Sequence, residues 1–270
     1  MSQFILSAFG DEISPHLDEQ IGVMLANDVH FLEFRSMEGR GIIDYPLPEV
    51  RAAHKKLVDA GMAVSAVGSP IGKIGIKDDF GPHLERFKQT IEVAHALETK
   101  YIRMFSFFIP HGDDPASYRD EVLKRWTSFV EASKGSGLIL LHENEKDIYG
   151  DTAERCLDLL ETLACDYVKA TFDPANFVQC QVETYPHAFN LLRKHTVYLH
   201  IKDARYQDGG VTPAGEGEGK LPEILAALHQ DGFEGFASIE PHLAHSLPGG
   251  GPELFGVAAS ALKKLLSRLP

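Results

Sequence analysis

Short runs of β-branched and aromatic residues alternate along the chain with longer segments whose apolar residues recur at helical spacing. The short runs predict β-strands and the longer segments predict helices. The alternation occurs eight times, so the sequence predicts eight consecutive βα units. The expected strands are Phe4–Phe9, Phe31–Arg35, Ala63–Gly68, Tyr101–Phe107, Leu138–Glu143, Val168–Asp173, Thr196–Lys202 and Phe236–Glu240. The expected helices are His16–Ala26, Pro48–Ala60, His83–Glu98, Ser117–Ser133, Asp151–Ala164, Tyr185–Lys194, Leu221–Gln230 and Glu253–Arg268.

Eight βα units in 270 residues are close to the usual size of a closed barrel, which takes about 250 residues. The main alternative is an open, doubly wound sheet, which normally has a glycine-rich phosphate turn after its first strand. That position reads Phe9-Gly10-Asp11-Glu12 and lacks the required glycine spacing. No Pro/Ser-rich linker or low-complexity tract divides the chain. We therefore expect an α/β fold in which one (β/α)8 TIM barrel domain covers residues 1–270.

The charge balance argues against a nucleic-acid-binding protein. The chain has 26 Lys and Arg against 39 Asp and Glu, a formal net charge of −13, and no run of residues forms a basic stripe. An acidic surface is repelled by the phosphate backbone of a nucleic acid. With 44% hydrophobic and 24% charged residues, the composition is that of an ordinary globular protein and excludes disorder as the main state.

Several absences in the sequence predict a cytoplasmic location. No stretch approaches the roughly 18 consecutive apolar residues of a membrane helix, and the first ten residues lack the positive charges of a signal peptide. The three cysteines form no CxxC pair, and their odd number suits a reducing compartment. We expect no membrane or nucleic-acid partner, and the sequence leaves a homo-oligomer open.

The last four expected strands all end in residues that can bind a metal, at the barrel end where active sites lie. These ends read His142-Glu143-Asn144-Glu145, Phe172-Asp173-Pro174-Ala175-Asn176, His200-Ile201-Lys202-Asp203 and Ile239-Glu240-Pro241-His242. Three carboxylates and one imidazole suit a divalent ion such as Mn²⁺, Mg²⁺, Co²⁺ or Zn²⁺, and the lack of thiolates argues against a structural zinc. One such residue could simply form a salt bridge, but four in succession predict a metal site at Glu143, Asp173, His200 and Glu240.

Side-chain alternation along the strands separates the candidates further. If Glu143 faces the barrel interior, then His142 points toward the helices and has a structural role. Lys202 shares the face of His200 and is a candidate substrate contact. Asp203 lies on the opposite face, where we expect it to orient a neighbour.

Taken in order, these strand ends and the segment Gly215-Glu216-Gly217-Glu218-Gly219 resemble the xylose-isomerase-like TIM barrels, which include sugar and sugar-phosphate isomerases and epimerases of the tagatose 3-epimerase type. The resemblance covers essentially the whole chain. It implies that the four strand-end residues bind one divalent ion, with Mn²⁺ the first expectation and Mg²⁺, Co²⁺ or Zn²⁺ the alternatives. It also implies that the two glutamates, Glu143 and Glu240, act as acid and base.

Further residues are expected to contact the substrate. Arg205 resembles the family arginine that follows the strand-seven histidine. Epimerases of this type often have a histidine three residues after the strand-six aspartate, where this chain has Asn176. His111 lies on the loop after the fourth strand, where a wall of the substrate pocket is expected. Glu33 and Arg35 end the second strand and could contact substrate or form a structural ion pair.

The sequence therefore predicts a metal-dependent isomerase or epimerase of a ketose or related small polyol, which moves a proton through a metal-stabilised enediolate. A lyase or dehydratase on the same barrel is the enzymatic alternative. In a metal-independent glycosidase, Glu143 and Glu240 would be the two carboxylates that flank the glycosidic bond. That reaction gives no role to Asp173 and His200, which makes it less favoured. A non-catalytic sugar-binding barrel is the alternative from another class.

Overall fold

The computed structural model describes residues 3–270, and its eight parallel barrel strands close in the order β1-β12-β9-β8-β7-β6-β5-β2. Closure comes from the pairing of the first and last strands, in which Gln3 lies beside Glu234 and Ala8 beside Ile239. The expected (β/α)8 TIM barrel is confirmed. The barrel strands are β1 (Gln3–Ala8), β2 (Phe31–Phe34), β5 (Ala63–Gly68), β6 (Tyr101–Met104), β7 (Ile139–Glu143), β8 (Val168–Phe172), β9 (Thr196–Ile201) and β12 (Glu234–Ile239).

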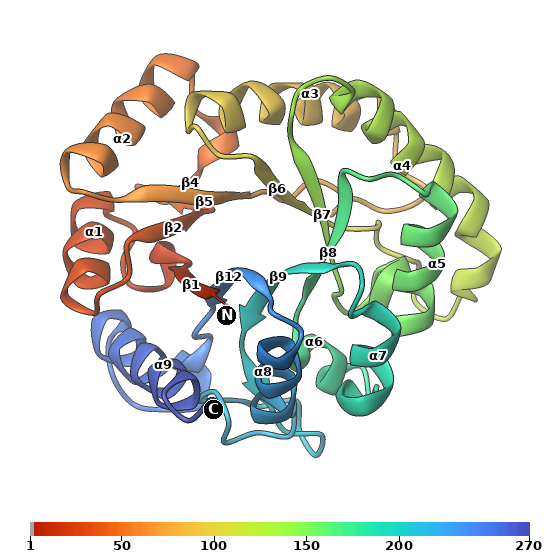
Figure 1. Cartoon of the computed structure of the whole chain (residues 1–270). Helices are drawn as coiled ribbons and strands as arrows, with labels where there is room; N and C mark the ends of the chain where they lie inside the picture. Colours follow the sequence, from red (N-terminus) through yellow and green to blue (C-terminus); the bar gives the residue numbers. More distant parts are fainter. Residues whose placement is uncertain (1–2) are drawn as a thin grey trace.

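The helices form a ring around the strands (Figure 1). They bury an apolar layer against the outside of the barrel, where Phe87, Trp126 and Phe255 are among the largest fully buried side chains. Such burial is the main force that holds a βα unit against its neighbours. The helices are α1 (Leu17–Ala26), α2 (Leu47–Asp59), α3 (Phe80–Ala96), α4 (Arg119–Ser133), α5 (Ala153–Leu163), α6 (Pro174–Gln179), α7 (Phe189–Leu192), α8 (Leu221–Gln230) and α9 (Gly251–Leu266).

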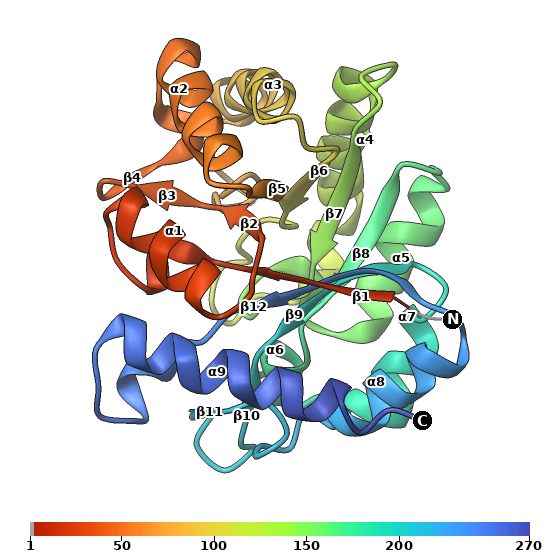
Figure 2. The same ribbon diagram turned by 60° about the vertical axis from the view of Figure 1, so that its left-hand side comes forward.

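Two short antiparallel ribbons extend the loops at the C-terminal end of the barrel. The ribbon of β3 (Ser36–Met37) and β4 (Arg40–Gly41) follows β2, and the ribbon of β10 (Asp203–Ala204) and β11 (Val211–Thr212) follows β9. Figure 2 shows both on the side of the barrel away from the N-terminus. They therefore lie at the end where the candidate metal ligands are expected.

The sixth helical segment differs most from the prediction of one helix over Tyr185–Lys194. The structure has a π-helical turn at Thr184–Ala188 followed by the short α7, and it adds α6 directly after β8. Tyr185 has an extended backbone, with φ −137° and ψ 131°. A residue that precedes a proline is driven away from helical geometry, and Pro186 follows here.

The fourth barrel strand ends earlier than predicted. It was expected to reach Phe107, but β6 ends at Met104. Beyond that residue the backbone bonds to the loop after β5, because the amide of Phe105 donates to the carbonyl of Ile71 and that of Phe107 donates to Gly72. The chain thus turns away from the barrel ladder and forms one wall of the cavity described below.

Below the C-terminal rim the barrel interior is closed by a polar and aromatic layer. Ser65 Oγ lies 2.5 Å from Ser7 Oγ and 2.9 Å from the hydroxyl of Tyr198. The ring of Tyr198 packs edge-on against His200, at 6.0 Å between centroids. This layer supports the candidate ligands from below.

No helix within residues 3–270 combines the length and apolar character that a membrane crossing needs. That a single domain covers residues 1–270 stays a prediction, and residues 1 and 2 lie outside the described part of the chain.

Candidate metal centre

The four predicted ligands meet at the C-terminal rim of the barrel. Glu143 is the last residue of β7, Asp173 follows β8, His200 lies in β9 and Glu240 follows β12. All four are buried, and each offers a ligand atom within 4.8 Å of those of the others. Period-two alternation along each strand turns these side chains into the barrel interior. The structure therefore brings together the complete set that the sequence singled out.

Asp173 divides its two carboxylate oxygens between two tasks. Its Oδ1 accepts the backbone N–H of Asn176, 3.0 Å away, and so caps the N-terminus of α6. Its Oδ2 is buried without a hydrogen-bond partner and faces the cluster, with Lys202 Nζ at 2.9 Å as its nearest cation. Burial raises the pKa of Asp173 to about 6, against the lowering effect of Lys202. A buried carboxylate oxygen without a hydrogen-bond partner among the described residues is suited to bind a metal ion.

Glu143 is held from three sides. Its Oε1 accepts the amide of Asn176 at 3.2 Å and lies 3.1 Å from His200 Nδ1, while Oε2 lies 3.2 Å from Arg103 Nε. Burial alone would raise the pKa of this carboxyl, but the charges of His200 and Arg103 outweigh it and lower the pKa to about 2. Glu143 is therefore an ionised carboxylate at neutral pH.

His200 presents different ring nitrogens to two groups of carboxylates. Nδ1 faces the cluster, at 3.8 Å from Asp173 Oδ2 and 3.9 Å from Glu240 Oε2. Nε2 faces Glu33, whose oxygens lie 3.3 and 3.2 Å away. Burial would lower the pKa of His200, but Glu143 and Glu33 raise it well above its usual value. Nδ1 is thus the atom placed to bind a metal.

Glu240 lies among cations. Its Oε2 accepts from Lys202 Nζ at 2.8 Å, and its Oε1 lies 3.4 Å from both Arg35 Nη1 and His242 Nε2. Burial opposes ionisation of this carboxyl, but Lys202 and His242 lead the charges that hold its pKa well below the usual value. Both glutamates of the cluster are therefore ionised.

The charges of the cluster fit a divalent ion. The carboxylates of Glu143, Asp173 and Glu240 share Lys202, Arg103 and Arg35 as cations, and the raised pKa of His200 adds a proton to the cluster. A divalent ion bound by the four ligand atoms would displace that proton and take over part of the compensation that buried carboxylates need. The residues present therefore fit the oxygen-rich site that their chemistry predicts.

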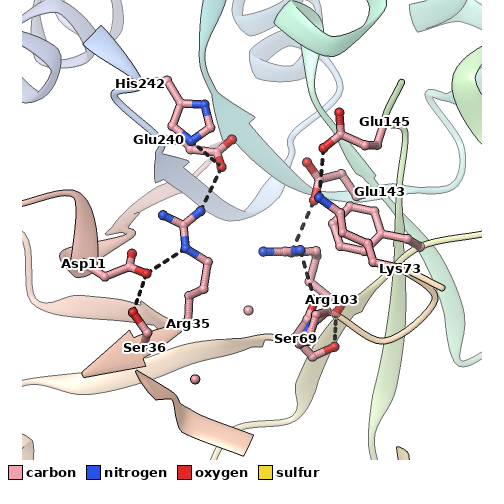
Figure 3. A pocket seen from close by; sticks show the side chains of 14 residues that line it. Asp11, Arg35, Ser36, Ser69, Lys73, Arg103, Glu143, Glu145, Glu240 and His242 are labelled. Atoms are coloured by element: carbon pink, nitrogen blue, oxygen red, sulfur yellow. Dashed lines mark hydrogen bonds and ion pairs between the residues drawn. The ribbon is translucent and has the colours of Figure 1, made fainter. Parts of the chain in front are cut away.

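A cavity of about 270 Å³ opens onto the cluster. Glu143 and Glu240 lie on opposite sides of it in Figure 3, with Arg35 and Arg103 extending between them. Arg35 is fixed by Asp11 at 2.7 Å and contacts the ring of Phe9 at 4.6 Å from its centroid. The cavity is thus polar and charged, as a site for a hydroxylated molecule should be.

The four predicted substrate contacts separate into two groups. Lys202 lies inside the cluster, and Asn176 is buried beneath it, where its amide binds Glu143 Oε1 and the carbonyl of Asn144. Arg205 instead pairs with Asp208 at 2.9 Å and lines a neighbouring cavity, and His111 is exposed on the loop after β6. The structure does not bring these last two to the candidate ligands.

The structure adds groups that the sequence did not assign to the site. Arg103 in β6 and Lys73 in the loop after β5 line the cavity. Glu33, for which the sequence left a substrate contact or a structural ion pair open, pairs with His200. An arginine within an otherwise apolar strand was the signal for Arg103, because a buried strand has little reason to carry one. Lys73 left no such signal, because its loop has no periodic pattern.

The two residues assigned to structural roles fit those assignments. His142 points away from the cavity, bonds Ser106 Oγ at 2.9 Å and packs on Trp126. Asp203 accepts backbone N–H groups from Gly215, Gly217 and Gly219 at 2.9, 3.1 and 2.8 Å. The alternating glycines of that segment therefore serve to wrap the chain around one buried carboxylate.

The model of the xylose isomerase-like TIM barrel family matches residues 28–265. The chain belongs to this family. No curated protein matches its sequence significantly. The matched residues include the seven barrel strands from β2 to β12.

Solved structures with the same fold are distant in sequence. The IOLI protein with a bound zinc atom has a TM-score of 0.79 at 16% identity, with 99% of each chain covered. L-ribulose 3-epimerase has a TM-score of 0.76 at 16% identity, covering 99% of this chain and 95% of that one. The probable 3-DHS dehydratase AsbF from Bacillus anthracis has a TM-score of 0.76 at 18% identity, covering 97% and 99%. At these identities the likeness establishes the fold alone.

Proposed function

We propose that the protein is a divalent-metal-dependent isomerase or epimerase of a ketose or related small polyol. The observation that carries this proposal is the pair Glu143 and Glu240, two buried, ionised carboxylates that line one cavity and share a cluster with Asp173 and His200. The likeness to the structure of L-ribulose 3-epimerase supports the same class of reaction.

A divalent ion held by the four cluster residues supplies a Lewis acid that stabilises negative charge developing on the oxygen of a substrate carbonyl. Mn²⁺ is the ion we propose first, with Zn²⁺, Mg²⁺ and Co²⁺ as alternatives that suit the same oxygen-rich ligands. The zinc atom in the structure of the IOLI protein supports a divalent ion in general and does not favour one of them.

Glu143 and Glu240 act as the base and the acid of the proton transfer. One removes it from the carbon next to the carbonyl, and the other returns one from the other side of the cavity. Return to the opposite face of the same carbon gives an epimer, and return to the neighbouring carbon gives an isomer. The short contacts of Lys202 with Glu240 and of Asn176 with Glu143 hold the two carboxylates in place meanwhile.

The test is a proton NMR assay in D₂O with metal-loaded protein and a panel of free ketoses. We expect loss of the signal from the C–H next to the carbonyl of one ketose, together with signals of its epimer or of an aldose. Protein treated with EDTA is the control and should give neither change. A panel that shows no exchange and no product contradicts the proposal, and binding without turnover would indicate a sugar-binding barrel.

A lyase is the second candidate, supported by the likeness to the probable dehydratase AsbF. The same carboxylates could remove a proton and protonate a leaving hydroxyl. Cyclic hydroxy acids in the same assay distinguish the two reactions, because a lyase product has lost one water and carries new vinylic proton signals. Such a product with no ketose conversion would favour the lyase.

A further inference from the structure

The wall of the cavity opposite Glu240 carries two cations. Arg103 extends from β6 and is 5% exposed, and Lys73 extends from the loop after β5. Both contact the ring of Phe105, with Lys73 Nζ 4.2 Å and Arg103 Cζ 4.6 Å from its centroid. Figure 3 shows both on the cavity side, next to Glu143 and Glu145. The aromatic ring therefore places two positive charges in one part of the cavity.

The guanidinium of Arg103 is incompletely paired. Within residues 3–270 its one hydrogen bond goes from Nη1 to the carbonyl of Ser69, at 3.1 Å. Its Nε is buried without a hydrogen bond, although Glu143 Oε2 lies 3.2 Å and Glu33 Oε1 3.7 Å away, and Nη2 has no hydrogen-bond acceptor among the described residues. Glu143 is also an expected metal ligand and Glu33 also pairs with His200, so neither carboxylate is a dedicated counter-ion for Arg103. A buried guanidinium with unused donors is costly unless something else binds it.

Lys73 and Arg35 differ in how many of their N–H donors face an acceptor. Lys73 Nζ has three N–H groups and, among the described residues, makes one hydrogen bond, to Glu145 at 3.2 Å. Arg35 faces a carboxylate with every nitrogen, since Asp11, Glu12 and Glu240 lie 2.7, 3.3 and 3.4 Å away. The charge of Arg35 is therefore already compensated, and the donors left open to the cavity are those of Lys73 and Arg103.

We propose that Lys73 and Arg103 form a subsite for a carboxylate group of the substrate. This inference rests on the proposed function and narrows it, because the substrate then binds the metal cluster with its hydroxyl and carbonyl oxygens and presents an acid at the other end. The substrate class is an acidic polyol, such as a uronate, rather than a neutral sugar. Charge-assisted bonds from lysine and arginine are the usual means of reading a carboxylate.

The surroundings favour a carboxylate over a phosphate. Glu143 and Glu145 lie in the same wall, and they repel a dianion more strongly than a monoanion. Phosphates are commonly held by the N-terminus of a helix, and within the described chain no residue that lines this cavity belongs to an α-helix. Two cations beside two carboxylates therefore suit a monoanionic carboxylate better than a dianionic phosphate.

The test measures affinity instead of turnover. Calorimetry on metal-loaded protein compares three uronates, those of galactose, glucose and mannose, each with its parent hexose and with the hexose 6-phosphate. We expect at least one uronate to bind about tenfold or more tightly than its hexose. Lys73→Met should remove most of that preference and leave the hexose affinity unchanged. Lys77→Met, in the same loop but paired with Asp113 outside the cavity, is the matched control and should change neither.

Equal affinity for each uronate and its parent hexose, or no binding of any of them, would overturn the subsite. A uronate preference that survives in Lys73→Met would also overturn it and would indicate that the acid binds the metal. Tighter binding of a hexose 6-phosphate than of the corresponding uronate would show that the site binds phosphate. Failure of the proposed function looks different, because the uronate preference would persist while no proton exchanges with D₂O.

Discussion

Glu33 accepts a hydrogen bond from Nε2 of His200, the ring nitrogen that does not face the metal cluster, with 3.2 Å between Nε2 and Glu33 Oε2. Glu33 lies in β2, on the other side of the barrel, and neither side chain is exposed. Nδ1 faces the carboxylates of Glu143, Asp173 and Glu240, so a metal ion bound there would leave the ring proton on Nε2, where Glu33 accepts it. The carboxylate thereby sets the tautomer and the orientation of the histidine, as carboxylates behind metal-binding histidines commonly do.

We predict that Glu33→Gln weakens binding of the metal by about 10- to 100-fold while the protein stays folded. The amide keeps the volume of the side chain but lacks the charge that favours a proton on Nε2. Calorimetric titration of metal-free protein with Mn²⁺ or Zn²⁺ measures the effect. Glu38→Gln is the control, since Glu38 pairs with His16 at 2.7 Å on the surface. Equal losses in both variants would show that Glu33 has no special role.

A second prediction concerns the metal itself. Purified protein should hold about one divalent ion per chain, and dialysis against a chelator should remove both the ion and the activity, because the four ligands form one site. His200→Ala should lose the ion, whereas His187→Ala, which removes a surface histidine paired with Glu154, should keep it. Elemental analysis by mass spectrometry gives the stoichiometry. Full activity in protein free of metal would contradict this assignment.

A third prediction separates proton transfer from folding. Glu143→Gln and Glu240→Gln should each lower turnover by a factor of about 10² to 10⁴, the range for loss of a general acid or base. Circular dichroism should show that the fold is kept, because glutamine fills the same space. Glu154→Gln on the surface serves as the control. Native turnover in either cluster variant would exclude that glutamate from the proton transfer.

A fourth prediction concerns Asp203, which accepts four backbone N–H groups, from Ala204 and from Gly215, Gly217 and Gly219. In Asp203→Asn an amide group would face some of these donors, so we expect a loss of about 1–3 kcal/mol in the free energy of unfolding. Urea denaturation measures it. Asp208→Asn, in the exposed loop of the same ribbon, should cost much less. A Cβ at Gly217 would collide with the Asp203 carboxylate, so Gly217→Ala should also destabilise.

Much of this arrangement could be predicted from the sequence because it depends on local periodicity. Hydrophobic spacing located the eight strands, and period-two alternation placed Glu143 and His200 in the interior and His142 outside. Since parallel strands in a barrel end on one rim, strand order alone brought the four ligands together. Fold and ligand cluster therefore followed from the same pattern.

What the sequence did not predict depends on contacts between distant segments. Lys73 reaches the cavity because the backbone of 105–107 leaves the barrel and bonds to the loop at 71–72. Arg205 turns outward because Asp208, three residues away, offers it a partner in a tight ribbon. Neither arrangement produces a periodic signal, and both are decided by which partner is nearest in space.

The last prediction concerns the pH dependence of stability and involves His83, away from the metal cluster. The side chain is buried, and its Nε2 accepts the backbone N–H of Gly72 at 2.7 Å, which requires that nitrogen to be unprotonated. Burial, with Arg86 and Arg125 nearby, lowers the pKa of His83 from 6.5 to about 4. The unfolded chain therefore binds more protons between these two values, and stability falls as the pH drops from about 6.5 toward 4.

The expected loss from this residue between pH 7.5 and pH 5 is up to about 2 kcal/mol in the free energy of unfolding. The measurement is urea denaturation at both pH values for the native protein and for His83→Gln. A glutamine oxygen can accept the N–H of Gly72 but does not titrate, so the variant should lose less stability on acidification. Because every other group is shared by the two proteins, the difference between their pH dependences isolates His83. Identical slopes would show that His83 is protonated without cost in the folded protein.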